Sequence, residues 1–285
     1  MMADKKIVFL DIDGTFTVPL EKPTELASRA VREARKNGHR ILLSTGRNMP
    51  IVSEDVLEVG FDGVVASAGR HIEIDGKVIR DSVLPEETIQ KCLEIFHRFG
   101  IYCRIESPEG IYIDDSLQEI LTGAMAELSN SELIRMKKEL DSGVGVKPYT
   151  EYPHKGAYKL GFICTDLADI EKTKPYLDQE FHYVVHPYAE DADCYNGEII
   201  QKDMDKGEAM ERVCEYYGAD MADTVAFGDS MNDQQMLEYA GIAVAMGNSC
   251  QELKDIADIV CESVEEDGVY FEFKRMNLME TRFIR

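Results

Sequence analysis

The chain has 285 residues, which is enough for one large domain or two modest ones, each able to bury a core. Its 54 acidic and 31 basic side chains give a formal net charge of -23, and such a surface repels nucleic acid and anionic membranes, so we expect neither as a partner. The N-terminus lacks the apolar core of a signal peptide, and no stretch is long and uncharged enough to span a bilayer. The seven cysteines contain no Cys-x-x-Cys pair, so we expect a cytoplasmic protein with reduced thiols.

The first predicted element is a buried strand that is followed by two acidic residues. Residues Ile7 to Leu10 are all apolar, and Asp11 and Asp13 follow before a turn at Gly14. Burying a carboxylate there is costly unless a cation or hydrogen-bond donors receive it. Two carboxylates would also suppress each other's ionisation unless a metal ion lay between them. An Asp-Gly turn after a strand is common, so this segment alone leaves a purely structural role open.

The next elements follow from apolar periodicity and turn residues. They are a helix over 25–36 that stops at Asn37-Gly38, a strand over 40–44, a helix over 51–58, a strand over 63–66 and a hairpin over 71–79. The first strand, the first helix and the second strand predict a β-α-β unit with a parallel strand pair.

Residues from about 85 to 199 show a different pattern, because no predicted strand in this range is followed by Asp-x-Asp-Gly as the first strand is. Helices are predicted over 86–99, 117–128 and 167–179, strands over 102–105, 111–113, 158–164 and 182–185, and a loop over 143–155. From Lys206 the β-α rhythm returns, with helices over 208–217, 232–239 and 249–257, strands over 224–227 and 242–245, and an acidic connection at 262–267 before a final strand. The pattern predicts one parallel-sheet α/β domain, formed by residues 1–84 and 200–285, interrupted by an insertion over 85–199.

Polar residues follow three of the predicted strands of this domain. Besides the first strand, Ser44-Thr45-Gly46-Arg47 ends the second, and Gly228-Asp229-Ser230-Met231-Asn232-Asp233 ends a third. Lys206-Gly207 opens a helix between them. Ligands of open α/β sheets bind outside the carboxyl ends of the strands, so we expect these groups to converge there.

These four segments, with Asp11-Ile12-Asp13-Gly14-Thr15 as the first, resemble the ordered motifs of the haloacid dehalogenase superfamily, and most closely its Cof-type sugar-phosphatase subfamily (subfamily IIB). An EF-hand is excluded by spacing, and no Gly-Lys-Ser or Gly-Lys-Thr of a P-loop occurs. The resemblance implies a Rossmann-like core with helices on both faces of a parallel sheet and an inserted α/β cap domain.

The resemblance also implies the roles of the acidic residues. Asp11 would be the nucleophile that forms an aspartyl-phosphate, and Asp13 would be the general acid and then the general base. Mg²⁺ would be held by the carboxylates of Asp11 and Asp229 and by the backbone carbonyl of Asp13. Asp233 would order the metal's waters or hold Lys206, the third catalytic residue.

The phosphate would be bound by residues from all four motifs. These are the amides of Ile12 and Gly46, the side chains of Thr45 and Asn232, and Lys206, which neutralises the phosphate. Arg47 would either touch substrate or bridge core and cap. The chain departs from the subfamily at Ala68, which stands where an asparagine is common, and Tyr149, Tyr152, His154 and Lys155 lie in a loop that either faces the cleft or is solvated.

We therefore expect a Mg²⁺-dependent hydrolase that removes phosphate from a small phosphorylated metabolite, with a sugar phosphate as the expected substrate. A phosphohexomutase that uses the same intermediate is the alternative, and a non-catalytic sensor of phosphorylated metabolites is a remote one, because no motif residue is missing. Dehalogenation is set aside, since it needs neither Asp13 nor a metal cluster. The sequence does not identify the substrate, and it allows a monomer or a small homo-oligomer.

Overall fold

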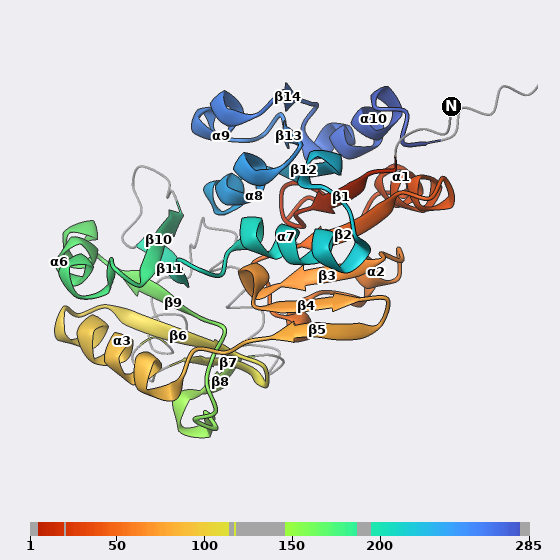
Figure 1. Cartoon of the computed structure of the whole chain (residues 1–285). Helices are drawn as coiled ribbons and strands as arrows, with labels where there is room; N and C mark the ends of the chain where they lie inside the picture. Colours follow the sequence, from red (N-terminus) through yellow and green to blue (C-terminus); the bar gives the residue numbers. More distant parts are fainter. Residues whose placement is uncertain (1–4, 20, 114–116, 118–145, 187–194, 280–285) are drawn as a thin grey trace, which may run out of the picture. The chain divides into compact units, whose positions relative to one another are not determined.

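The computed structural model describes residues 5–19, 21–113, 117, 146–186 and 195–279 (Figure 1). Their contacts divide the chain into two units. The first, which we call the core unit, comprises Met1–Arg47, Val52–Asp81 and Met204–Arg285. The second, the inserted unit, comprises Asn48–Ile51 and Ser82–Asp203. Among the described residues, no helix has the length and apolar character that crossing a membrane requires.

The core unit is built on an eight-stranded sheet in the order β14-β13-β12-β1-β2-β3-β4-β5. Six strands run parallel, namely β1 (Ile7–Leu10), β2 (Arg40–Ser44), β3 (Gly63–Ala66), β12 (Thr224–Gly228), β13 (Ile242–Ala245) and β14 (Ile259–Val260). The hairpin of β4 (His71–Ile74) and β5 (Lys77–Asp81) adds two antiparallel strands at one edge. Leu10 is in register with Leu43 on one side and Phe227 on the other, so the residues that follow β1, β2 and β12 leave the sheet at one rim.

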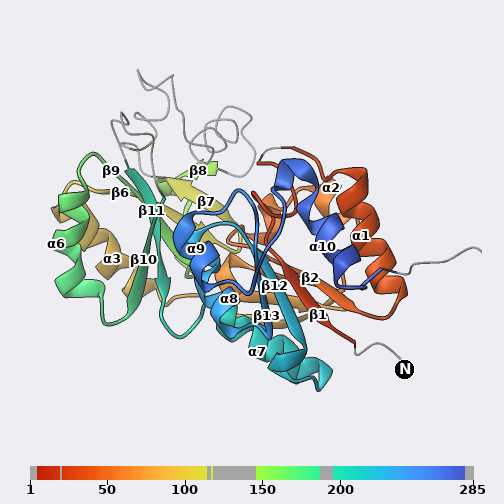
Figure 2. The same cartoon turned by 90° about the horizontal axis from the view of Figure 1, so that it is seen from above.

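Helices cover both faces of this sheet (Figure 2). On one face lie α7 (Lys206–Tyr217), α8 (Gln234–Tyr239) and α9 (Gln251–Ile256), whose apolar side chains join Phe9 and Leu42 in one buried cluster. On the other face lie α1 (Glu25–Lys36) and α10 (Gly268–Arg275), where the rings of Phe227 and Phe273 are 5.5 Å apart. The described part of the unit also contains the single turn α2 (Glu54–Leu57). The expected α/β fold with a parallel sheet and helices on both faces is confirmed.

The inserted unit has its own six-stranded sheet in the order β10-β11-β9-β6-β7-β8. Its strands are β6 (Tyr102–Ser107), β7 (Gly110–Ile113), β8 (Val146–Pro148), β9 (Lys159–Cys164), β10 (Phe181–His186) and β11 (Tyr195–Gln201), antiparallel except for the pair β7 and β8. The helices α3 (Glu86–Arg98) and α6 (Leu167–Leu177) pack on one face, where Phe96 lies 5.9 Å from Phe162 between ring centroids.

Charged side chains occupy the opposite face of the inserted unit's sheet. Successive side chains of a strand point to opposite faces, and Cys103, Ile105, Leu160 and Ile199 belong to the helix-covered core. Their neighbours Arg104, Glu106, Lys159 and Glu198 therefore lie on the other face, and all four are buried. Arg104 Nε is 2.8 Å from Glu106 Oε1, and Lys159 Nζ pairs with both glutamates. Such a paired arrangement is what buried charges require.

Several expected elements differ from the structure. The loop predicted over 143–155 contains β8, because Val146 pairs with Ile111 of a strand distant in sequence. In the same loop Tyr152 and His154 both reach Glu86 at 2.8 Å, which ties the loop to the start of α3. The predicted helix over 51–58 is broken into a 3₁₀ turn at Met49–Ile51 and α2, and the structure contains the strand β11, which was not expected.

The chain end differs as well. A helix, α10, follows the acidic connection where a final strand was expected, because Val269 and Phe273 are buried one helical turn apart. Glu262 of that connection pairs with Arg275 of the helix. The helix predicted over 117–128 lies outside the described residues apart from Leu117.

Candidate active site

The candidate site lies at the rim where β1, β2 and β12 end, and β1 supplies its first carboxylate. Ile7 and Phe9 face the cluster with α7, and the two-residue period of a strand places Asp11 on that same face. Asp11 is 5% exposed. The chain then turns at Gly14, whose φ of 84° is in the left-handed region that favours glycine. A Cβ at Gly14 would lie 2.4 Å from Asp229 Oδ2, so glycine is also needed for this close approach.

Lys206 joins two of the acidic segments. It is the first residue of α7, which begins at the N-cap Asp205, whose carboxylate accepts hydrogen bonds from the amides of Gly207 and Glu208. The side chain of Lys206 is 2% exposed, and its Nζ donates to Asp11 Oδ1 at 2.6 Å and to Asp233 Oδ1 at 2.5 Å. The lysine therefore holds carboxylates from β1 and from the segment after β12.

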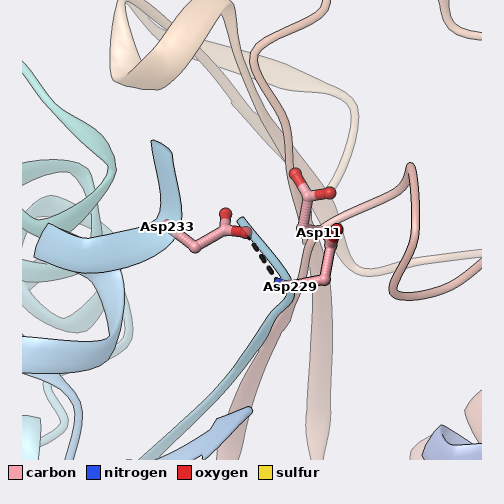
Figure 3. A group of neighbouring side chains, drawn as sticks. All are labelled: Asp11, Asp229 and Asp233. Carbon is pink, nitrogen blue, oxygen red and sulfur yellow. Dashed lines mark hydrogen bonds between the residues drawn. The ribbon is translucent and has the colours of Figure 1, made fainter. Parts of the chain in front are cut away.

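Three carboxylates, those of Asp11, Asp229 and Asp233, converge at this point (Figure 3). Each offers an oxygen atom, and these atoms lie within 4.8 Å of one another. Asp233 is fully buried, and its Oδ2 accepts from the amides of Asp229 at 3.0 Å and Ser230 at 3.3 Å. Thr15 Oγ1 donates to Asp229 Oδ1 at 3.1 Å, so the turn after β1 also orients this carboxylate.

The electrostatics of the cluster favour an additional cation. Burial is the main factor that raises the pKa of Asp11 to about 7; Lys206 opposes the rise, and Asp233 adds to it. The pKa of Asp229 is raised well above its usual range by burial and by the neighbouring carboxylates Asp233 and Asp11. Burial acts to lower the pKa of Lys206, but the two carboxylates it contacts outweigh this and raise it. The ammonium of Lys206 thus pairs with two of the three carboxylates, and a divalent cation would offset the remaining negative charge.

The donor set fits Mg²⁺, which binds hard oxygen ligands and usually keeps several of its waters. Asp11, Asp229 and Asp233 all offer carboxylate oxygens. In this arrangement Asp233 is already engaged by Lys206 and by two amides. Two roles were expected for Asp233, and the structure shows the contact with Lys206 that one of them requires.

Arg47 forms an ion pair with Asp13. Its Nε donates to Asp13 Oδ2 at 2.7 Å and its Nη2 to Asp13 Oδ1 at 2.5 Å, a bidentate geometry that fixes both side chains. The Asp13 side chain is 34% exposed and that of Arg47 12%. Thr45 Oγ1 accepts from the amide of Arg47 at 3.1 Å, so the hydroxyl stabilises the loop that carries the guanidinium.

The segment after β3 supports that loop through its backbone. Ser67 and Ala68 have φ values of 53° and 54°, which are uncommon for residues other than glycine, asparagine and aspartate. The amide of Ser67 donates to the carbonyl of Arg47 at 2.9 Å, and the amide of Ala68 donates to that of Thr45 at 3.1 Å. The side chain that Ala68 lacks is therefore not needed for this contact.

The other expected phosphate-binding residues lie on the same loops. Ile12 is fully buried, and its carbonyl accepts from the amides of Phe16 and Thr17. Gly46 and Asn232 are half-buried, and Asn232 Oδ1 accepts from Ser230 Oγ at 2.7 Å.

Two contacts were not anticipated from the sequence. Thr15 belongs to the first motif, but only the structure shows its hydroxyl on Asp229. Asn248 follows β13, and its amide nitrogen donates to the carbonyl of Gly14 at 2.8 Å. A turn-forming Gly-Asn pair after a strand was the signal available for the second.

Comparisons with known proteins agree with this architecture. Residues 8–273 match the model of a family described as haloacid dehalogenase-like hydrolase. The protein YkrA of Bacillus subtilis (strain 168) is 29% identical over 287 residues, which cover 97% of this chain and 100% of YkrA. The 5-amino-6-(5-phospho-D-ribitylamino)uracil phosphatase YitU of the same organism is 25% identical over 272 residues, covering 92% of this chain and 94% of YitU.

A solved structure shows the same fold. The subclass IIB sugar phosphatase BT4131 superposes with a TM-score of 0.77 over 96% of this chain and all of its own, at 21% identity. These matches confirm the resemblance that the four motifs indicate.

Proposed function

The chain belongs to the haloacid dehalogenase-like hydrolase family, and we propose that it is a magnesium-dependent phosphatase that acts on small phosphorylated metabolites through an aspartyl-phosphate. The observation that carries the proposal is the convergence of Asp11, Asp229 and Asp233, two of which pair with the buried ammonium of Lys206. A hydrolase of phosphate monoesters needs a nucleophile and a local positive field. The first is a carboxylate here, and a cation together with Lys206 would supply the second.

Asp11, Asp229 and the backbone carbonyl of Asp13 would hold Mg²⁺, with Asp233 fixing Lys206 beside them. When bound, the cation would neutralise charge on the phosphoryl oxygens. Lys206 donates to Asp11 Oδ1 at 2.6 Å, which orients the nucleophile and adds positive charge where the phosphate would lie.

In the first step an oxygen of Asp11 forms a bond to phosphorus while the bond to the leaving oxygen breaks, and Asp13 gives its proton to that oxygen. In the second step Asp13 takes a proton from water, the water oxygen bonds to phosphorus, and the bond to Asp11 breaks. Inorganic phosphate leaves and both aspartates return to their starting state.

Arg47 and Thr45, on the loop after β2, would bind the phosphate. The amides of Ile12 and Gly46 and the side chain of Asn232 would bind it as well. The guanidinium of Arg47 is paired with Asp13 in this structure, which orients the acid-base carboxylate. An incoming phosphate would offer Arg47 a second pair of oxygens of the kind that guanidinium groups bind. Arg47 would thus pair with Asp13 before the substrate binds and contact the phosphate afterwards.

The substrate class is supported by the relatives. YitU acts on a phosphorylated ribityl compound, and BT4131 is a sugar phosphatase. We propose that this chain likewise takes a phosphorylated sugar or sugar alcohol. Residues 1–84 and 200–285 would form the catalytic core and residues 85–199 a cap that selects the substrate. We further propose that the protein works in the cytoplasm, as a monomer or a small homo-oligomer.

The test is a screen of phosphorylated sugars, sugar alcohols, nucleotides, and flavin and pyridoxal esters for release of inorganic phosphate, with Mg²⁺ and with EDTA. We expect release that needs Mg²⁺ and is abolished in Asp11→Asn, while the variant stays folded by circular dichroism. Release without any added bisphosphate favours hydrolysis over a phosphohexomutase. Activity retained in Asp11→Asn would contradict the covalent mechanism, and full activity in EDTA would contradict the metal.

A further inference from the structure

Asn248 links the turn after β1 to the segment between β14 and α10. Its Nδ2 donates to the carbonyl of Gly14 at 2.8 Å, and its Oδ1 accepts from the amide of Val264 at 3.0 Å. The first partner only accepts and the second only donates, so a flipped amide would lose both hydrogen bonds. The orientation of the Asn248 side chain is therefore determined by its surroundings.

The position of the Gly14 carbonyl affects the groups on both sides of it in the turn. It belongs to the peptide that leads into Thr15, whose hydroxyl donates to Asp229 at 3.1 Å. The peptide on the other side of Gly14 carries the carbonyl of Asp13, and the amide of Gly14 donates to the carbonyl of Thr17 at 2.8 Å. With φ of Gly14 at 84°, both neighbouring peptides depend on how this one residue is held.

The loop that carries Asn248 is itself attached to the residue before Asp229. The amide of Met246 donates to the carbonyl of Gly228 at 3.0 Å, and Ser249 Oγ donates to the same carbonyl at 3.3 Å. One short loop thus contacts the backbone next to Asp229 and, through Asn248, the backbone next to Asp13. The loop fixes the spacing of two segments that are distant in the sequence.

We propose that Asn248 is a positioning residue of the active site: by holding the Gly14 carbonyl, it sets where the Asp13 carbonyl and the Thr15 hydroxyl stand relative to Asp229. The proposal rests on the proposed function. There the Asp13 carbonyl is a ligand of the cation, and the Thr15 hydroxyl orients a second ligand, Asp229. Partners that orient metal ligands typically change metal affinity or activity about 10-fold to 100-fold when they are removed.

The experiment compares Asn248→Asp and Asn248→Ala with a matched control, Asn37→Asp. Asn37 Nδ2 also donates to a backbone carbonyl, that of Leu278 at 2.8 Å, on elements that carry no candidate site residue. Asn248 is an exposed residue, so its replacement leaves no void in the core. Mn²⁺ binding is measured by electron paramagnetic resonance, hydrolysis of p-nitrophenyl phosphate gives kcat and KM, and thermal melts report folding.

We expect both Asn248 variants to bind Mn²⁺ about 10-fold more weakly and to lose kcat by a similar factor with little change in KM. Asn37→Asp should change neither quantity, whatever it does to the melting temperature. The extra negative charge of Asn248→Asp would by itself strengthen cation binding, so weaker binding reports on the geometry of the turn. Wild-type-like Mn²⁺ affinity and kcat in both Asn248 variants would overturn the inference alone. A wild-type protein that neither binds Mn²⁺ nor releases phosphate would overturn the proposed function, and this inference with it.

Discussion

Replacing Asp11 by asparagine should stabilise the metal-free protein at neutral pH, and the gain should grow with pH. The Asp11 carboxylate is buried, and its pKa is raised from 3.8 to about 7, mainly by burial and against the opposing attraction of Lys206. The folded state therefore keeps a proton on Asp11 at pH values where the unfolded chain has released it. Asparagine has the same shape and carries no ionisable group.

The size and sign of the effect follow from linkage. Stability changes with pH according to the difference in bound protons, and the folded state binds more of them between pH 4 and 7. Asp11 therefore contributes stability that is fully present below pH 3.8 and is lost as pH rises through about 7. Since each pKa unit corresponds to about 1.4 kcal/mol, the loss over this range is about 4 kcal/mol.

The assay is urea unfolding of the wild type and Asp11→Asn in EDTA, at steps from pH 4.5 to 8. Groups that titrate in the same window, such as His39 with its pKa lowered by burial, are shared by both proteins. The difference between the two free energies of unfolding thus reports the charge of Asp11, including its effect on the neighbouring Asp229. It should move in favour of the variant by about 3 to 4 kcal/mol as pH rises.

Mg²⁺ should act against this trend. A ligand that binds only the folded state stabilises it by about 2.7 kcal/mol at a concentration 100 times its dissociation constant. The wild type should gain this at pH 8 and the variant should gain less, since a metal ligand has lost its charge. A difference between the two proteins that is independent of pH in EDTA would refute the assignment of Asp11 as the strained carboxylate of the site.

Three further outcomes are expected. Gly14→Ala should abolish phosphate release and weaken Mn²⁺ binding, because its Cβ would lie 2.4 Å from Asp229 Oδ2; a variant with normal kinetics would show that the turn adapts. Ala68→Gly should raise the free energy of unfolding in urea by about 1 kcal/mol, since φ is 54° at this position, and a loss of stability would contradict the strain. Lys159→Met should destabilise the inserted unit by about 3 to 5 kcal/mol, as it removes the ammonium from two buried carboxylates. The exposed pair of Lys172 offers the control, and Lys172→Met should leave the midpoint of the same urea titration nearly unchanged.

Local patterns predicted the elements whose residues carry their own signal. The helix over 25–36 is found with these limits, because Thr24 caps its start and Asn37-Gly38 its end. The strand over 40–44 and the hairpin around Asp75-Gly76 also follow the prediction. In each case the apolar periodicity and the turn residues that define the element lie within it or next to it in the sequence.

Elements that depend on distant partners were missed or misassigned. β8 exists because Val146 pairs with Ile111, and β11 lies between β9 and β10 of the same sheet. The segment before Arg275 was expected as a strand, yet burial of Val269 and Phe273 at helical spacing makes it a helix. Short apolar runs do not distinguish a strand from a helix until their packing partners are known.

The same division applies to the candidate site. The residues that can carry the chemistry are visible in the sequence, since carboxylates and an arginine follow predicted strands and a lysine opens a predicted helix. Their pairings depend on the tertiary fold: Lys206 with Asp11, Arg47 with Asp13, and Asn248 with the Gly14 carbonyl. These contacts join residues 34 to 234 positions apart. Their distances are set by strand register and by the helices packed on the sheet, which no local pattern encodes.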